Sequence, residues 1–276
     1  MSLDHTNILG DTIAKIAAEK GGIIKDEVPV VISPQTEEAL KVIKTIAAER
    51  NTLVKKATRE FDVVVKKHDL SGQLLNIETP RRGYEFKLPL IGKHQMENAL
   101  TAICTIETLE ELGHQIDKDC VESGMANLSW PGRFEVLKSS DPIVIVDGAH
   151  NPDSMDKLAN TVKDTVNSSR IIVVFGSIGG HDITEMLESL KPLNPILIPV
   201  SSRHPKSVSC EVVKKASLGC GIDTIGRYDT VSQGLDYALS IASEKDLVLA
   251  TGSLSVVAEV SEAINQIPPE FYYNLP

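Results

Sequence analysis

The alternation of short apolar runs with helical patterns after Pro142 restricts this chain to few folds. The predicted strands are aliphatic and largely β-branched, as is typical of buried parallel strands. They cover residues 143–146, 171–175, 196–200 and 247–250, with a further short strand expected at 223–225. The predicted helices cover residues 153–166, 183–190, 208–218, 230–243 and 254–266. Repeated strand–helix units predict a mostly parallel, doubly wound α/β sheet with right-handed crossovers.

The part of the chain before this alternation has a mixed pattern. Helices are predicted at residues 12–20, 37–50, 92–112 and 117–127, and a strand at 28–32. Three β-type runs, at 63–67, 74–78 and 84–88, are separated by turns and predict antiparallel strands, one pair of them a hairpin. The segment Trp130-Pro131-Gly132-Arg133 then breaks the helical pattern and indicates a domain junction. We therefore expect two domains, residues 1–135 and 136–276.

Composition limits the class of protein. The chain has 276 residues, 42% of them hydrophobic and 24% charged, which is ordinary for soluble domains. The net charge of −10 argues against a general nucleic-acid or anionic-membrane surface. Four cysteines without Cys-x-x-Cys spacing favour reduced thiols. No apolar run of about 18 residues and no signal-peptide pattern are present, so we expect a cytoplasmic protein.

Polar residues follow the first strand of the alternating region in the turn Asp147-Gly148-Ala149-His150-Asn151-Pro152. In open α/β sheets, ligands bind at the carboxyl ends of the strands. The loops 176–180 and Thr251-Gly252-Ser253 end two further strands at the same edge, so a pocket is expected there. An ordinary strand-to-helix loop with an asparagine cap fits the first turn equally well.

Three other positions have polar side chains that could bind a ligand. The amide of Asn98, near a helix start, suits an adenine edge, although helix capping is the simpler interpretation. The Arg133 guanidinium could bind phosphates through two parallel N–H donors, or it could form an interdomain salt bridge. His5 and Lys20 flank one helix, but Mg²⁺ prefers carboxylate and phosphate oxygens, so these two alone do not predict a metal site. The sequence contains no Gly-x-x-x-x-Gly-Lys-Ser/Thr phosphate loop.

Taken in order, six segments resemble the folylpolyglutamate synthase/dihydrofolate synthase family of the Mur-ligase superfamily. They are Leu3-Asp4-His5-Thr6 with Leu9-Gly10-Asp11-Thr12, Glu19-Lys20 with Gly22-Ile23-Ile24-Lys25, Gly92-x-His94-Gln95-x-x-Asn98-Ala99, Trp130-Pro131-Gly132-Arg133, Asp147-Gly148-Ala149-His150-Asn151-Pro152 and Thr251-Gly252-Ser253. The resemblance implies a truncated Mur-ligase central ATPase domain followed by a Rossmann-like, glutamate-ligase C-terminal domain.

The resemblance also implies an ATP-dependent ligase. ATP would phosphorylate a folate or dihydropteroate carboxylate, and the amine of L-glutamate would attack the acyl phosphate. Two anions meet in the first step, so Mg²⁺ and cationic side chains must neutralise them. The family pattern gives His5 and Lys20 as magnesium ligands, with Lys20 carbamylated so that it becomes a carboxylate and a catalytic residue.

The same pattern assigns further residues. Asn98, Arg133 and Asp147 are implied to contact the nucleotide, with Arg133 on phosphate. His150 and Ser253 are implied to be catalytic residues on the glutamate side.

The chain departs from the family pattern in two respects. His181 stands where the family usually has lysine in Asp-Lys-Asp. In the full-length family a phosphate loop precedes the Asp-His motif with which this chain opens. We therefore expect a fragment or one half of a split protein, inactive without a separate phosphate-loop chain. The alternatives are a non-catalytic nucleotide- or glutamate-binding module and another Mur-type ligase.

Overall fold

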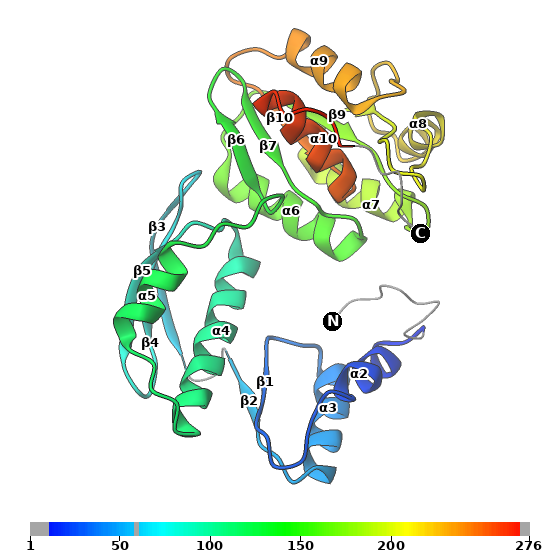
Figure 1. The fold of residues 1–276 in the computed structure, drawn as a ribbon. Coiled ribbons are helices and arrows are strands. Elements are labelled where there is room, and N and C mark those ends of the chain that lie inside the picture. Colours follow the sequence, from blue (N-terminus) through cyan, green and yellow to red (C-terminus); the bar gives the residue numbers. More distant parts are fainter. Residues whose placement is uncertain (1–10, 58–60, 271–276) are drawn as a thin grey trace. The chain divides into compact units, whose positions relative to one another are not determined.

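The computed structural model describes residues 11–57 and 61–270. Its contacts divide the chain into two compact units, residues 1–89 with 93–128, and residues 90–92 with 129–276 (Figure 1). The Trp130-Pro131-Gly132-Arg133 segment belongs to the second unit. The domain boundary between residues 135 and 136 stays a prediction.

The first unit begins with two helices and a pair of short strands. Helices α2 (Ile13–Gly21) and α3 (Glu37–Glu49) pack on each other, and their first turns are capped by the hydroxyls of Thr12 and Thr36. Strand β1 (Val30–Ile32) pairs in parallel with β2 (Val54–Lys56). The sequence did not predict β2, because only one of its three residues is apolar.

The remainder of the first unit is an antiparallel sheet with two helices. Strands β3 (Asp62–Asp69), β4 (Gly72–Glu78) and β5 (Gly83–Leu88) form a meander, which confirms the predicted antiparallel strands. The long helix α4 (Lys93–Glu111) follows, and then α5 (Lys118–Ala126), which packs on β5. The sheet buries Leu75, Ile77, Tyr84, Phe86 and Leu88.

The second unit is built on a five-stranded sheet in the order β6-β7-β10-β8-β9 (Figure 1). Strands β7 (Ile143–Val146), β10 (Leu247–Thr251), β8 (Ile171–Phe175) and β9 (Ile196–Pro199) are parallel. Strand β6 (Glu135–Ser139) runs antiparallel to β7 at the sheet edge and was not predicted. The strand predicted at residues 223–225 is wrong, because only a single bridge, Leu197 to Thr224, forms there.

Helices cover both faces of this sheet. They are α6 (Pro152–Thr165), α7 (Ile183–Leu190) with the short 3-10 helix η1 (Lys191–Leu193), α8 (Cys210–Gly219), α9 (Val231–Ile241) and α10 (Leu254–Asn265). Alternate strand residues point to opposite faces. Val248 and Ala250 of β10 pack in one buried cluster with α9 and α10, whereas Thr251 contacts Met155 of α6 across 4.0 Å. The doubly wound α/β fold predicted from the sequence is thereby confirmed.

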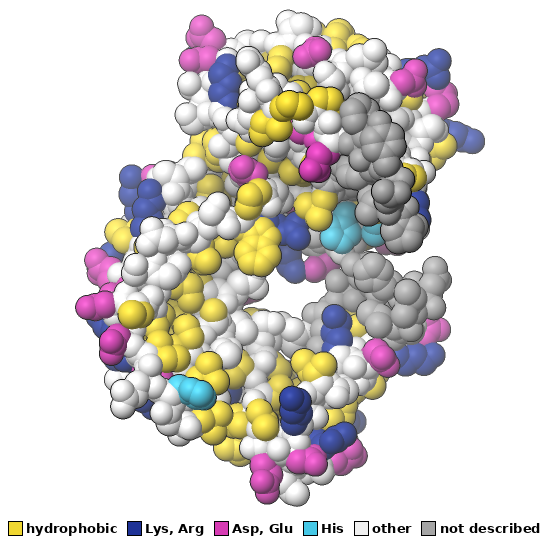
Figure 2. Space-filling view, viewed as in Figure 1, with side chains coloured by type: hydrophobic (Ala, Val, Ile, Leu, Met, Phe, Trp, Pro, Cys, Tyr) yellow, Lys and Arg dark blue, Asp and Glu magenta, His cyan; other side chains and the backbone are white. Residues whose placement is uncertain are grey.

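The surface carries charges of both signs. Figure 2 shows Lys/Arg and Asp/Glu side chains interspersed over the face in view. Across the described ranges, no helix combines the length and apolar character that crossing a membrane requires.

Candidate functional site

The loops that follow three parallel strands of the second unit, β7, β10 and β8, meet at one edge of its sheet. The Asp147 N–H donates to the Ala250 carbonyl across 3.0 Å, and the Gly252 N–H donates to the Ala149 carbonyl across 3.2 Å. The Gly176 N–H donates to the Thr251 carbonyl across 3.3 Å. The strand-end loops expected to converge therefore do so, at the edge where open α/β sheets bind ligands.

The carboxylate of Asp147 joins the loop after β7 to the turn that precedes β6. Its side chain is buried, with Oδ2 accepting from the Phe134 N–H (2.7 Å) and Oδ1 accepting from the Ala149 N–H (2.8 Å). Burial raises the pKa of Asp147, while the two N–H donors and the charge of Arg133 act in the opposite direction. Asp147 therefore fixes the segment that carries Arg133 against the end of β7.

We expect Asp147→Asn to destabilise the second unit by about 2 kcal/mol. An asparagine amide offers one acceptor oxygen, so its NH₂ group would face one of the two backbone N–H donors. Urea unfolding followed by circular dichroism measures the change. Asp153→Asn is the matched control, because Asp153 is exposed and its only ion-pair partner among the described residues is Lys157, one turn along α6. Equal stabilities for the two variants would show that the Asp147 carboxylate does not hold the Arg133 segment against β7.

Arg133 lies in a tight turn with unusual backbone angles. Gly132 has φ 74°, and the buried Phe134 has φ 44°, a left-handed conformation that bulky residues rarely adopt. The Gly148 N–H donates to the Gly132 carbonyl across 2.9 Å, which joins this turn to the Asp147 turn. Within the described residues, the Arg133 guanidinium makes no hydrogen bond or ion pair. Its donors are therefore available to a ligand.

His150 is held in one orientation beside a second histidine. Its Nδ1 lies 2.9 Å from the Gly148 carbonyl oxygen, which can only accept, so Nδ1 carries the proton. In the neutral ring Nε2 is then the acceptor atom. The His150 and His181 rings meet edge to face, with centroids 5.3 Å apart. The position where the sequence departs from the family pattern therefore touches a predicted catalytic residue.

Ser253 and Asn151 begin helices at this edge. The Ser253 hydroxyl accepts from the Val256 N–H (3.3 Å) and lies 3.1 Å from the Ser255 hydroxyl. Asn151 forms a capping box with Ser154 at the start of α6. The structure thus brings Ser253 to the edge where Asp147 and His150 lie, in a buried capping position. The asparagine cap considered from the sequence is present, and it coexists with the cluster of polar side chains.

The other predicted site residues belong to the first unit or lie outside the described residues. Asn98 is exposed in the second turn of α4, where its amide donates to Gln95 Oε1 across 3.1 Å. Lys20 is exposed in the last turn of α2. His5 lies outside the described residues. No group of three or more His, Cys, Asp or Glu side chains that could hold a metal occurs in the described ranges, so these residues alone do not form a magnesium site.

Sequence reasoning missed Leu254 as part of this edge. Its side chain is 53% exposed, and its Cδ2 would lie 2.4 Å from a Cβ added to Gly148 and 3.5 Å from one added to Gly132. Leu254 therefore covers the two glycines beside Arg133. The apolar residue directly after Ser253 was the available signal, but helix periodicity alone does not show what such a residue covers.

Comparison with known proteins identifies the family. Residues 1–106 match the model of the Mur ligase middle domain, and residues 132–254 match that of the Mur ligase glutamate ligase domain. The chain belongs to the Mur ligase family. Its curated relatives confirm the folylpolyglutamate/dihydrofolate synthase branch inferred from the motifs.

The dihydrofolate synthase/folylpolyglutamate synthase of Bacillus subtilis is 31% identical over 265 residues, which are 95% of this chain and 60% of the relative. The Escherichia coli K12 protein of the same name is 30% identical over 96% of this chain and 58% of the relative.

Solved structures of Mur ligases agree with this assignment. Mycobacterium tuberculosis folylpolyglutamate synthase complexed with ADP and AMPPCP matches with a TM-score of 0.84 and 27% identity, over 98% of this chain and 63% of that one. Escherichia coli FolC in complex with DHPP and ADP matches with a TM-score of 0.82 and 28% identity, over 96% of this chain and 60% of that one. The chain spans about three fifths of the length of these relatives. They give no support to the predicted separate phosphate-loop chain.

Proposed function

We propose that the protein carrying this chain is an ATP-dependent ligase that joins L-glutamate to a folate or dihydropteroate carboxylate. ATP phosphorylates the carboxylate and releases ADP, and the glutamate amine then displaces phosphate from the acyl phosphate to form the amide. The names of the relatives and the nucleotide complexes of the M. tuberculosis and E. coli proteins support this assignment.

The observation that carries the proposal is the Arg133 guanidinium, which makes no hydrogen bond or ion pair with the described residues, beside the Asp147–His150 turn. A planar guanidinium recognises phosphate through paired N–H donors. Asp147 holds the backbone of the arginine turn in place, so the guanidinium reaches a phosphoryl group from a fixed position on the chain. His150 offers Nε2 to the glutamate ammonium or its departing proton, and Ser253 lies on the same edge.

Three residues of the first part of the chain complete the proposal. Asn98 would contact the adenine, and His5 together with carbamylated Lys20 would hold magnesium. The metal would neutralise phosphate charge. Because the described residues form no metal cluster, the roles of Arg133, Asp147 and His150 are derived without it.

The proposal is tested by ATP-dependent incorporation of labelled L-glutamate into dihydropteroate or tetrahydrofolate by the native protein. One phosphate should be released for each amide formed. Glutamate binding by calorimetry without turnover in this assay would favour a binding module. Turnover with a cell-wall precursor in place of the pterins would instead identify another Mur-type ligase.

We expect Gly148→Ala to weaken ADP binding by roughly tenfold while leaving stability within about 1 kcal/mol. A Cβ at this position would lie 2.8 Å from Arg133 Nη1 and 2.4 Å from Leu254 Cδ2, and both are flexible side-chain ends that must move. Calorimetric titration with ADP measures the effect. Gly179→Ala is the control, because its added Cβ meets only the Lys206 carbonyl at an ordinary 3.7 Å. Unchanged ADP affinity in Gly148→Ala would remove Arg133 from the nucleotide site.

A further inference from the structure

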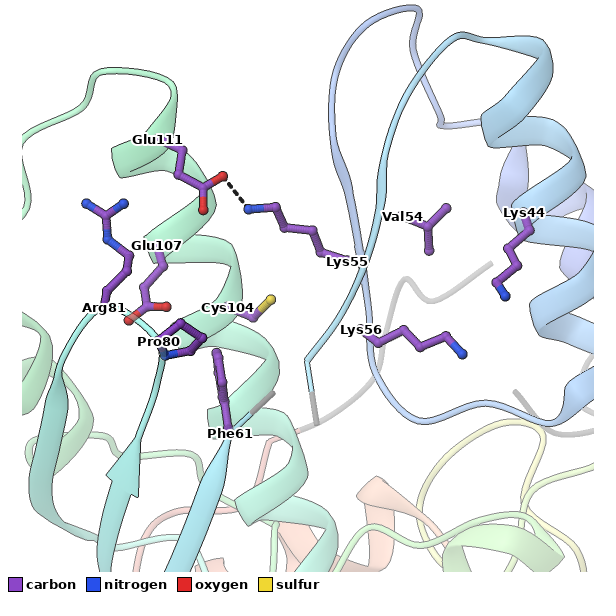
Figure 3. Close-up of a pocket in the computed structure, with 10 residues that line it drawn as sticks. All are labelled: Lys44, Val54, Lys55, Lys56, Phe61, Pro80, Arg81, Cys104, Glu107 and Glu111. Atoms are coloured by element: carbon purple, nitrogen blue, oxygen red, sulfur yellow. Dashed lines mark hydrogen bonds and ion pairs between the residues drawn. The ribbon is translucent and has the colours of Figure 1, made fainter. Parts of the chain in front are cut away.

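A cavity of about 370 Å³ lies within the first unit (Figure 3). Its walls come from α3, β2, the turn between β4 and β5, and the second half of α4. The α4 residues that line it run from Cys104 to Glu111. At about 1.5 Å of rise per helical residue, they lie roughly 9 to 20 Å along α4 from Asn98. The cavity is therefore separate from the predicted adenine contact.

The acidic groups on the α4 side of the cavity already have hydrogen-bond or ion-pair partners. The buried Glu107 carboxylate accepts from the Thr79 hydroxyl (2.6 Å) and the Tyr84 hydroxyl (3.1 Å). Lys55 forms an ion pair with Glu111, drawn as a dashed line in Figure 3. Glu107 therefore keeps one negative charge on this wall, whereas Arg81, which also lines the cavity, lies 3.6 Å from the Glu110 carboxylate.

The opposite wall carries two ammonium groups, those of Lys44 and Lys56. Figure 3 shows Lys56 on the side of β2 that faces α3, from which Lys44 extends. Among the described residues, neither lysine makes a hydrogen bond or an ion pair. The helix neighbours of Lys44 at three and four positions are Leu40, Lys41, Ala47 and Ala48, none of them acidic. Two cations with no ion-pair partner among the described residues thus line one cavity, where they outnumber the single negative charge of Glu107.

We propose that this cavity binds a small organic phosphate. A phosphate monoester carries close to two negative charges at neutral pH, which two ammonium groups balance as point charges. Val54, Phe61 and Pro80 also line the cavity and provide apolar surface for the organic part. The volume lies within the range of small-molecule pockets. The proposal is independent of the ligase assignment, because it uses none of those residues.

Phenyl phosphate titrated into the isotopically labelled chain tests the proposal by NMR chemical shifts. We expect saturable binding with a Kd on the order of 1 mM. The double variant Lys44→Gln/Lys56→Gln should weaken binding at least about tenfold, and rising salt should weaken it in the parent protein. Lys25→Gln/Lys41→Gln removes the same charge from exposed positions outside the cavity and should bind as the parent does.

Two further measurements separate the outcomes. Phe61→Ala should weaken phenyl phosphate binding several-fold and leave inorganic phosphate binding unchanged, because only the ester uses the apolar wall. The chemical-shift changes that Lys44→Gln/Lys56→Gln abolishes should be those of residues lining the cavity, which distinguishes this cavity from the proposed nucleotide site. Equal binding by both double-lysine variants, or equal affinities for phenyl phosphate and inorganic sulfate, would overturn the proposal.

Discussion

Arg133→Ala is expected to lower the rate of ATP-dependent glutamate addition by about 10²- to 10³-fold, the loss typical of removing one fixed electrostatic stabiliser. The guanidinium has no intramolecular partner within the described part of the chain, so its donors are free to bind phosphate. For the same reason the variant should lose less than about 1 kcal/mol of stability. Incorporation of labelled glutamate measures the rate, and urea unfolding of the same preparation measures the stability.

The control for this prediction is Arg133→Lys. Lysine retains the positive charge but loses the planar pair of donors, so an intermediate loss is expected. A lysine variant as slow as the alanine variant would mean that the planar pair of guanidinium donors, and not the positive charge, accounts for the whole loss of rate. An alanine variant with normal turnover would show that Arg133 is not part of the catalytic centre, and the proposed function would lose its main support.

The fold of the second unit could be predicted because its parallel strands are buried on both faces. Ile143–Val146 and Leu247–Thr251 read as continuous apolar runs, and the intervening helices have clear periodicity. The antiparallel edge strand Glu135–Ser139 lacks such a run, and a Pro-Gly turn precedes it. The three-residue strand Val54–Lys56 has two lysines and gains its structure from pairing with β1. Short edge strands depend on their neighbours, so local pattern does not reveal them.

The sequence predicted which loops form the candidate site, but not the contacts between their side chains. Strand order places Asp147, Gly176 and Ser253 at one edge, so their convergence follows from topology. Individual contacts do not follow from it. The edge-to-face contact of His150 with His181 depends on how two loops fold back, and the bonds from Asp147 depend on a left-handed Phe134. Neither conformation has a signature in residue spacing.

Asp246→Ala is expected to destabilise the second unit by about 3 kcal/mol, or roughly 8 °C in Tm. Asp246 is fully buried immediately before β10, and its Oδ2 accepts from Arg170 Nε (3.1 Å) and Nη2 (2.6 Å). The same oxygen accepts from the Ser243 N–H and hydroxyl, each at 2.8 Å. The substitution removes this shared acceptor oxygen, and those of its donors that water cannot reach are left unsatisfied. Thermal unfolding followed by circular dichroism measures the loss.

The pH dependence of stability tests the same network through its charge. The Arg170 guanidinium, helped by Ser243, lowers the pKa of Asp246 from 3.8 to about 2. A lowered folded-state pKa favours the ionised form, so this stabilisation is complete above about pH 4 and is lost as pH falls toward 2. The stability gap between the parent protein and Asp246→Ala should therefore be widest at pH 7 and narrow by pH 3. Asp246→Asn keeps an acceptor oxygen but no charge, so at pH 7 it should be less destabilised than Asp246→Ala. A gap between the parent and the alanine variant that stays constant from pH 7 to pH 3 would mean that the charge of Asp246 contributes nothing.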